Sequence, residues 1–375
     1  MTSTTLPIAV DDPINARILH VSEDRVEGFV ADPFETIAAM ADVAVEEVVT
    51  RIAAMLRAGT IRRVRQTLLA TNLAPGALVA WRMPSGRVAA AFDYMFQQDP
   101  FSGHVVIRTT DEATPGSDYR LWTTLKVPRP YAMEAHCDFL AAKTGAEAYR
   151  MMPARCLFTL GVGHVRRRHI EPGSRAPVPA NPDFAKVVDL NRRQWRVLVA
   201  MKRPFEVDEI APNPWAKRAE AIGMSLDAFV GEGKALNARG VVGRFSTFLE
   251  HVKKHADGST VTRYNALFHW AVPAGRELDA GGEVGRHHVM THAYWREAGA
   301  AFNHVNVMGV AHGTEKQRLL DHKQAIDNHL AQRGIPVTYT NVFWGGRSEI
   351  KPSEIDPVAY AAWSQRVGLG TQDAS

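Results

Sequence analysis

A histidine followed four residues later by an arginine occurs twice in this chain, as His104 with Arg108 and as His292 with Arg296. Imidazole titrates near neutral pH and can transfer a proton in catalysis, whereas a guanidinium stays charged and binds carboxylates through two hydrogen bonds. On a β-strand, residues i and i+4 face the same side about 13 Å apart, so each motif can contact a flat anionic ligand at two points. We therefore interpret His292 and His104 as candidate catalytic residues, and Arg296 and Arg108 as candidate ligand-binding residues.

The surroundings of the two motifs also repeat. Each motif follows, at a nearly constant distance, the related strings WRMPSGR at 81–87 and WAVPAGR at 270–276. Residues 58–63 (AGTIRR) correspond in the same way to residues 239–244 (RGVVGR). The chain is therefore predicted to consist of two related halves, and the segment 171–186, rich in proline and alanine, is predicted to link them.

Each half begins with residues that predict helices. The pair Asp32-Pro33 predicts an N-cap followed by the first helical residue, and Asn213-Pro214 repeats this arrangement. Ser225 is a further N-cap candidate, and Gly59 and Gly240 are positioned to end the second helix of each half. A short apolar strand follows each glycine. The order helix, turn, helix, glycine and strand is typical of a winged helix-turn-helix.

The rest of each half is predicted to contain strands and helices in the order β-α-β-β-α-β, which is ferredoxin-like. The expected fold class is therefore α+β, with two tandem copies of a winged helix-turn-helix plus a ferredoxin-like domain, related by pseudo-two-fold symmetry. We expect the winged helix-turn-helix domains at 10–70 and 187–250, and the ferredoxin-like domains at 76–170 and 260–355.

This architecture resembles that of the Lrp/AsnC proteins, and three segments of the second half resemble the siroheme decarboxylase family more specifically. These segments are NPWAKRAEAIGMS at 213–225, GVVGRF at 240–245 and THAYWR at 291–296. The first half carries the same landmarks more loosely, including YRLWTT at 119–124 and MPARCLF at 152–158. The chain is thus similar to a fused, two-half member of this family over nearly its whole length.

The resemblance implies a carboxy-lyase that removes CO2 from the C12 and C18 acetate groups of siroheme. The product would be 12,18-didecarboxysiroheme, an intermediate for haem d1 or alternative haem biosynthesis. The resemblance implies no added cofactor, because the iron arrives with the tetrapyrrole substrate. Residues 302–307 read FNHVNV, where the family tends to have Tyr-Asn-x-Trp-Phe-Thr, so the exact substrate stays open, as does the half that holds the active pocket.

Further residues are candidates for contacts with this substrate, which carries eight carboxylates. Fixed cations suit such a ligand, which makes Arg244 and Arg63 candidates. Tyr294, Asn303 and Trp122 complete the set of candidate binding residues. A dedicated protein metal site is not expected, because the histidines near 287–292 have no carboxylate or cysteine beside them. His292 or His104 is instead a candidate ligand of the substrate iron.

The composition favours a globular protein that binds an anion. The net charge is +4, there are only two cysteines, and neither a signal peptide nor a membrane-spanning apolar run is visible. We therefore expect a cytoplasmic protein without membrane contact, with an anionic tetrapyrrole as its partner. The sequence leaves self-association into a homo-oligomer open.

Two alternative functions remain. An Lrp/AsnC-type transcription regulator that senses a ligand would share the fold, and so would a haem- or tetrapyrrole-binding protein without catalysis. The would-be recognition helices begin VEE at 45–47 and SLDAFVGE at 225–232. Acidic side chains at these positions are repelled by DNA phosphates, so DNA is an unlikely partner.

Overall fold

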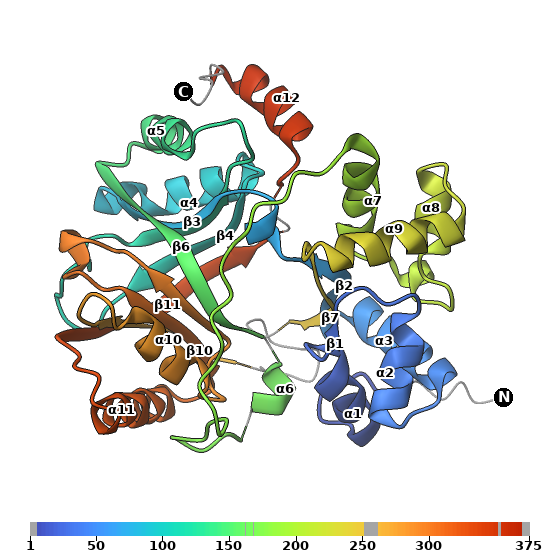
Figure 1. The fold of residues 1–375 in the computed structure, drawn as a ribbon, viewed down its shortest axis with the longest axis horizontal. Coiled ribbons are helices and arrows are strands. Elements are labelled where there is room, and N and C mark those ends of the chain that lie inside the picture. The colour runs from blue at the N-terminus through green and yellow to red at the C-terminus, as the bar shows by residue number, and fades with distance from the viewer. Residues whose placement is uncertain (1–5, 162, 168, 251–261, 352–353, 370–375) are drawn as a thin grey trace. The chain divides into compact units, whose positions relative to one another are not determined.

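The computed structural model describes residues 6–161, 163–167, 169–250, 262–351 and 354–369. The chain forms two compact units, and each takes segments from both halves of the sequence (Figure 1). Unit 1 contains the described residues of Met1–Leu69, Gly161–His169 and Val188–Arg263. Unit 2 contains those of Ala70–Leu160, Ile170–Val187 and Tyr264–Ser375.

Unit 1 combines helices from both halves with one small sheet. The helices are α1 (Pro13–Ser22), α2 (Pro33–Ala41), α3 (Val45–Ala58), α6 (His164–Arg167), α7 (Arg192–Lys202), α8 (Ala216–Ala221) and α9 (Leu226–Ala238). The antiparallel sheet has the order β1 (Val26–Glu27), β7 (Val242–Leu249) and β2 (Ile61–Leu68). Because β7 of the second half lies between two strands of the first, the halves share one sheet in unit 1. The sequence of one half alone therefore does not predict which strands pair in this sheet.

Most of the predicted helix ends in unit 1 are confirmed. The Asp32 side chain accepts hydrogen bonds from the first turn of α2, Ser225 does the same for α9, and Gly59 ends α3 with φ of 81°. The predicted cap at Asn213 is wrong. Asn213 has φ of 55°, its carbonyl accepts from the Ala216 amide, and α8 begins at Ala216 without a side-chain cap. Asn213 therefore forms the turn before the helix, because its left-handed backbone keeps its side chain away from the N-cap position.

Helix α6 is held within unit 1 by two adjacent carboxylates at the end of α1. Asp24 Oδ2 pairs with Arg166 Nη2 at 2.8 Å and Arg167 Nη1 at 3.1 Å, and Glu23 Oε2 accepts from the Val165 amide at 2.8 Å. Burial raises the pKa of Asp24, but its two arginine partners outweigh this and lower that pKa to about 2. Burial raises the pKa of Glu23 to about 8. Glu23 is therefore largely protonated in the folded protein at neutral pH, beside an ionised Asp24.

Replacing Glu23 by glutamine is expected to stabilise the protein at pH 8–9 by roughly 1–3 kcal/mol and to change it less at pH 5. The folded-state pKa lies above the unfolded value, so the neutral carboxyl favours the folded state at low pH. That contribution is lost as pH rises from about 4.5 to about 8. Glutamine keeps the acceptor for Val165 and does not ionise. Chemical denaturation at both pH values measures the difference, and an equal gain at pH 5 and pH 9 would contradict the assignment.

Unit 2 is a closed barrel of eight antiparallel strands. In chain order they are β3 (Gly76–Arg82), β4 (Ser102–Thr109), β5 (Leu121–Lys126), β6 (Ala148–Leu160), β8 (Tyr264–Ala271), β9 (His292–Arg296), β10 (Val307–Gly313) and β11 (Tyr339–Ile350). Around the barrel the order is β10-β8-β11-β4-β5-β3-β6-β9. With α4 (Val88–Gln97), α5 (Met133–Thr144), α10 (Glu277–Gly285) and α11 (Lys316–Gln332), each half follows the predicted order β-α-β-β-α-β. The two sets of strands join through the pairs β6–β9 and β11–β4, so they form one barrel.

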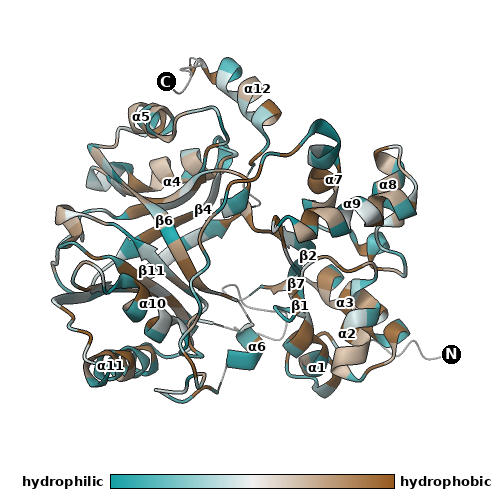
Figure 2. Cartoon of the chain, viewed as in Figure 1, coloured by the Kyte–Doolittle hydropathy of each residue, from teal (hydrophilic) through white to brown (hydrophobic). Residues whose placement is uncertain are grey.

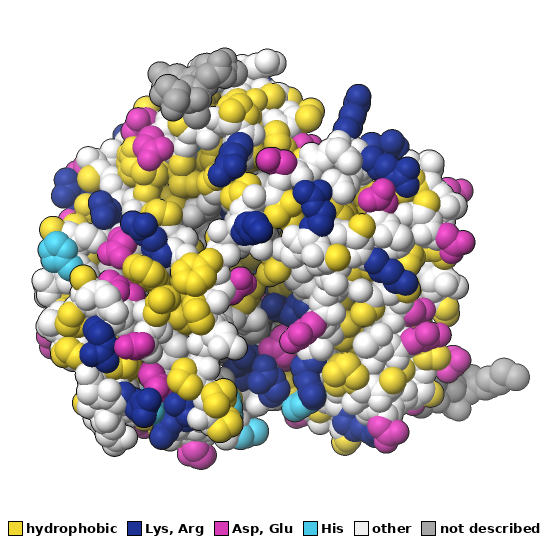
Figure 3. Space-filling view, viewed as in Figure 1, with side chains coloured by type: hydrophobic (Ala, Val, Ile, Leu, Met, Phe, Trp, Pro, Cys, Tyr) yellow, Lys and Arg dark blue, Asp and Glu magenta, His cyan; other side chains and the backbone are white. Residues whose placement is uncertain are grey.

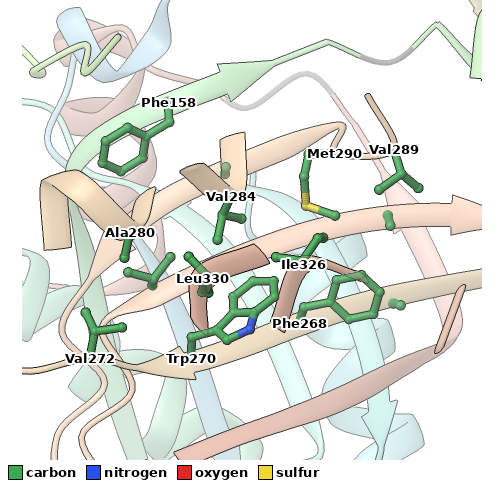
Figure 4. Packing of buried hydrophobic residues seen from close by; sticks show 14 of the residues in the cluster. Phe158, Phe268, Trp270, Val272, Ala280, Val284, Val289, Met290, Ile326 and Leu330 are labelled. Atoms are coloured by element: carbon green, nitrogen blue, oxygen red, sulfur yellow. The ribbon is translucent and has the colours of Figure 1, made fainter. Parts of the chain in front are cut away.

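Hydrophobic clusters lie on both sides of the barrel wall. Outside it, one cluster fills the space under α10 and α11, where Phe268 and Trp270 of β8 meet Val284 and Ile326 (Figure 4). A second outer cluster lies beneath α4, α5 and the C-terminal helix α12 (Pro357–Val367). The third cluster lies inside and includes Trp122. Hydrophobic and hydrophilic residues both occur along the strands (Figure 2), as expected when a wall faces helices on one side and a partly polar interior on the other.

No described helix is long and apolar enough to cross a membrane.

Candidate functional site: the polar layer inside the barrel

Both histidine-arginine motifs lie on strands of the barrel and face its interior. On β9, His292, Tyr294 and Arg296 alternate with Ala293 and Trp295, and these last two contact the outer cluster under α10 and α11. Because side chains alternate along a strand, the first three residues face inward. The same alternation places the inward residues of β4 at His104, Val106 and Arg108, since Val106 belongs to the inner cluster.

The inward residues of β9 form a stack. The rings of His292 and Tyr294 lie 5.9 Å apart with an angle of 18° between their planes. The guanidinium carbon of Arg296 lies 4.4 Å from the Tyr294 ring centre, which is cation–π geometry. Tyr294 thus fixes the positions of both members of the motif. Arg296 is 8% exposed, and its Nη1 donates to the Met152 carbonyl at 2.5 Å.

A chain of hydrogen bonds connects the two motifs. Arg108 Nη1 donates to Asn265 Oδ1 at 3.2 Å, and Asn265 Nδ2 lies 3.0 Å from His312 Nε2. His312 Nδ1 lies 3.4 Å from Thr291 Oγ1, which lies 3.1 Å from His292 Nδ1. Asn265 and His312 come from paired positions on β8 and β10. The arginine of the first-half motif is therefore linked to the histidine of the second-half motif.

The donors in this chain determine which nitrogen of each imidazole carries a proton. Arg108 can only donate, so the Asn265 amide nitrogen faces His312 and donates to its Nε2. Thr291 Oγ1 donates to the Val310 carbonyl at 3.0 Å, so it accepts from the imidazoles. The Nδ1 of His292 is then the protonated nitrogen, and Nε2 is the atom that carries a lone pair or, in the imidazolium, a transferable proton.

Arg296 has a cationic neighbour at the end of β5. Lys126 is half-buried, and the positive charge of Arg296 acts on it. Burial, with a smaller contribution from Arg296, lowers the pKa of Lys126 to about 8. Lys126 pairs with Gly76 on β3, where an added Cβ would lie 2.7 Å from Lys126 Nζ. The glycine therefore makes room for the lysine side chain.

The barrel interior holds more positive charge than its own residues neutralise. Among the described residues, no carboxylate lies within ion-pair distance of Arg108, Arg296 or Lys126, and Nε of both arginines is buried without a hydrogen-bond acceptor. Burial lowers the pKa of Arg108 to about 10 and lowers that of Arg296. On the face drawn in Figure 3, by contrast, Lys and Arg are scattered among Asp and Glu. Buried charges are normally paired, so the interior is suited to an anion.

Two further inward histidines differ in environment. His104 Nε2 lies 2.8 Å from Ser348 Oγ at the half-buried end of β4. His269 is 1% exposed, and its Nε2 has no hydrogen-bond partner. Burial lowers the pKa of His269 to about 3, with smaller contributions from the charges of Arg108 and Lys323. His269 is therefore a neutral ring within the apolar layer, whereas His104 belongs to the polar layer.

The other residues singled out from the sequence lie elsewhere. Trp122 is fully buried in the inner cluster, and its indole nitrogen donates to the Tyr119 carbonyl. Asn303 is exposed in the loop after β9, where its φ of 49° ends a short 3-10 turn. Arg63 and Arg244 belong to unit 1, on β2 and β7.

Arg63 and Arg244 are part of a larger group of arginines on the unit 1 sheet. The group also includes Arg62 and Arg65 of β2. Burial lowers the pKa of Arg65 to about 10, with smaller contributions from the other three arginines. Burial also lowers the pKa of Arg244, although Asp24 and Glu23 oppose this. Unit 1 thus carries its own concentration of positive charge.

Sequence reasoning did not identify Asn265, His312, Lys126 or His269. Each lies near a strand end or in an apolar strand without a recognisable motif around it. Their inward orientation follows from the alternation of side chains along β5, β8 and β10, which requires knowing which face of each strand lines the interior. Among the described residues, no group of three or more His, Cys, Asp or Glu side chains is arranged to hold a metal ion.

One segment of the barrel matches the model of a known protein family. Residues 74–159 match the AsnC-like ligand-binding domain. The matched segment covers β3 to β6 and therefore includes His104, Arg108 and Lys126. This AsnC-like segment supplies half of the barrel strands. No curated protein matches the chain by sequence.

The fold of nearly the whole chain is similar to that of a protein of known structure. The crystal structure of the siroheme decarboxylase NirDL matches with a TM-score of 0.65 and 17% sequence identity, covering 94% of this chain and 97% of NirDL. A structure of NirDL in complex with an iron-uroporphyrin III analogue matches with a TM-score of 0.64 and 17% identity, covering 94% of this chain and 98% of NirDL. The likeness shows that the AsnC-like segment belongs to a NirDL-like fold.

Proposed function

We propose that this chain is a tetrapyrrole decarboxylase that removes CO2 from acetate side chains of siroheme. The observation that carries the proposal is a group of cations without acidic partners in the barrel interior that His292 also faces. The group consists of the buried Arg108 and Arg296 and the half-buried Lys126. Siroheme has eight carboxylates, so it supplies the missing negative charge. The shared fold with NirDL supports the same class of ligand.

The proposed reaction needs a proton but no oxidant or reductant. The C–C bond to the carboxylate breaks, CO2 leaves, and the electron pair remains on the methylene carbon, where conjugation with the macrocycle stabilises it. The imidazolium of His292 then gives its Nε2 proton to that carbon, which becomes a methyl group. Thr291 Oγ1 accepts from His292 Nδ1 before and after this transfer, so the contact persists while the charge changes. Arg296, held by Tyr294, would bind a carboxylate of the same substrate.

We propose that the chain is a tandem duplication in which each half contributes a winged helix-turn-helix and a ferredoxin-like domain. The same element order in the two halves of unit 2 supports this proposal. A pseudo-two-fold relation would place His104 and His292 in equivalent positions. The hydrogen-bond chain reaches His292, which makes the second-half motif the candidate for proton transfer.

Anaerobic incubation of the purified chain with siroheme, followed by mass spectrometry of the tetrapyrrole, tests the function. The expected result is loss of one or two CO2 masses (about 44 Da each). Binding with unchanged mass would replace the enzyme by a tetrapyrrole carrier. Retention on DNA that weakens with salt, together with no siroheme binding, would overturn both and favour a ligand-sensing regulator.

A further inference from the structure

Two rows of inward side chains cross the barrel at equivalent registers, and their compositions differ. In the first row, His312 pairs with Asn265, Asn265 with Gly345, and Gly345 with Arg108. In the second row, Lys126 pairs with Gly76, and Arg296 pairs with Ala154. The two pairs belong to one row because Ala77 and Pro153, the neighbours of Gly76 and Ala154 along their strands, pair with each other. Each row therefore ends in a motif arginine, but only the first contains a neutral amide and an imidazole beside it.

The first row supplies two acceptors to one nitrogen of its arginine. Asn265 Oδ1 and the Phe343 carbonyl both accept from Arg108 Nη1, at 3.2 and 3.5 Å. The amide nitrogen of Asn265 in turn donates to His312 Nε2. In this row the Nη1 of the single cation has two protein acceptors, and only its Nε is buried without one.

The second row concentrates charge instead. Gly76 stands at the position that corresponds to Asn265, and Lys126 fills the space beside it. The Arg296 guanidinium donates to the Met152 carbonyl and lies against Tyr294, and its Nε is buried without an acceptor. Two cations that repel each other are thus held in one row, and no described carboxylate neutralises either of them. A carboxylate between them would relieve the repulsion and accept hydrogen bonds from both.

We propose that Lys126 and Arg296 together bind one carboxylate of the ligand, and that the two rows divide the work. The Lys126–Arg296 row holds the substrate, while the Arg108–Asn265–His312 row orients His292. This assignment rests on the proposed function. It adds Lys126 as a binding residue, at the position that His312 occupies in the other row.

The test uses the full chain and iron uroporphyrin III, an octacarboxylate, as the probe in absorbance titrations. Lys126→Met is expected to weaken binding about 10- to 100-fold, the usual effect of removing one charged hydrogen-bond partner. Lys126→Arg keeps the charge and is expected to recover most of the affinity. Lys143→Met, which removes an exposed lysine of α5, is the matched control and is expected to bind like the wild type.

Circular dichroism and thermal melting establish that each variant is folded. If the wild type binds iron uroporphyrin III and Lys126→Met binds it equally well, the carboxylate assignment fails and the proposed function stands. The assignment also fails if Lys126→Arg binds as weakly as Lys126→Met, because charge would then not be the cause. If the wild type binds neither this probe nor siroheme, the proposed function fails and the assignment fails with it.

Discussion

Replacing His292 by alanine is expected to slow decarboxylation of siroheme by about 10²–10⁴-fold while siroheme still binds. The expected loss follows from the removal of the imidazole that donates its proton in the proposed reaction and whose Nδ1 contacts Thr291 Oγ1. The carboxylate contacts of Arg296 would remain, since Tyr294 still supports that guanidinium. Single-turnover kinetics under anaerobic conditions, with binding measured separately by absorbance, resolves the two effects.

His288→Ala is the matched control, because His288 is exposed in the same segment and bonds to Ser174. It is expected to turn over siroheme at the wild-type rate. A His292→Ala protein that keeps full activity would remove His292 from the mechanism and direct attention to His104. Equal losses in binding and rate would instead show that His292 holds the substrate, for example through its iron.

Replacing Arg296 by methionine is expected to have opposite effects on stability and on binding. The ligand-free protein is expected to gain roughly 1–3 kcal/mol in free energy of unfolding, because a buried guanidinium without a carboxylate partner is removed. Affinity for iron uroporphyrin III is expected to fall about 100-fold, since a charged hydrogen-bond pair to the ligand is lost. Thermal melting with and without the ligand measures both quantities on one sample.

Arg276→Met provides the comparison, because Arg276 is partly exposed and pairs with Asp279 at 3.0 Å. Loss of that surface ion pair is expected to change stability by less than about 1 kcal/mol and to leave binding intact. An Arg296→Met protein that is less stable than the wild type would mean that the cation contributes more through Tyr294 and Met152 than its burial costs. Unchanged affinity in that variant would exclude Arg296 from the ligand site.

The local features of this protein could be predicted from its sequence. Apolar periodicity and caps such as Asp32 and Ser225 located the helices, because helix ends depend on residues within one turn. The spacing of His292 and Arg296 placed both side chains on one face of a strand, because that face is set by the alternation of the chain. The repeated element order of unit 2 was visible for the same reason.

The residues that those elements enclose became apparent only in the folded protein. Closure of the barrel through β6–β9 and β11–β4, and the placement of β7 between β1 and β2, depend on pairing between residues far apart in the chain. Local patterns do not encode such pairing, since any strand with an apolar face satisfies them. Closure brings Asn265 and His312 to Arg108 and sets Lys126 in the same row as Arg296. The excess of buried positive charge, from which the proposed ligand follows, therefore exists only in the folded barrel.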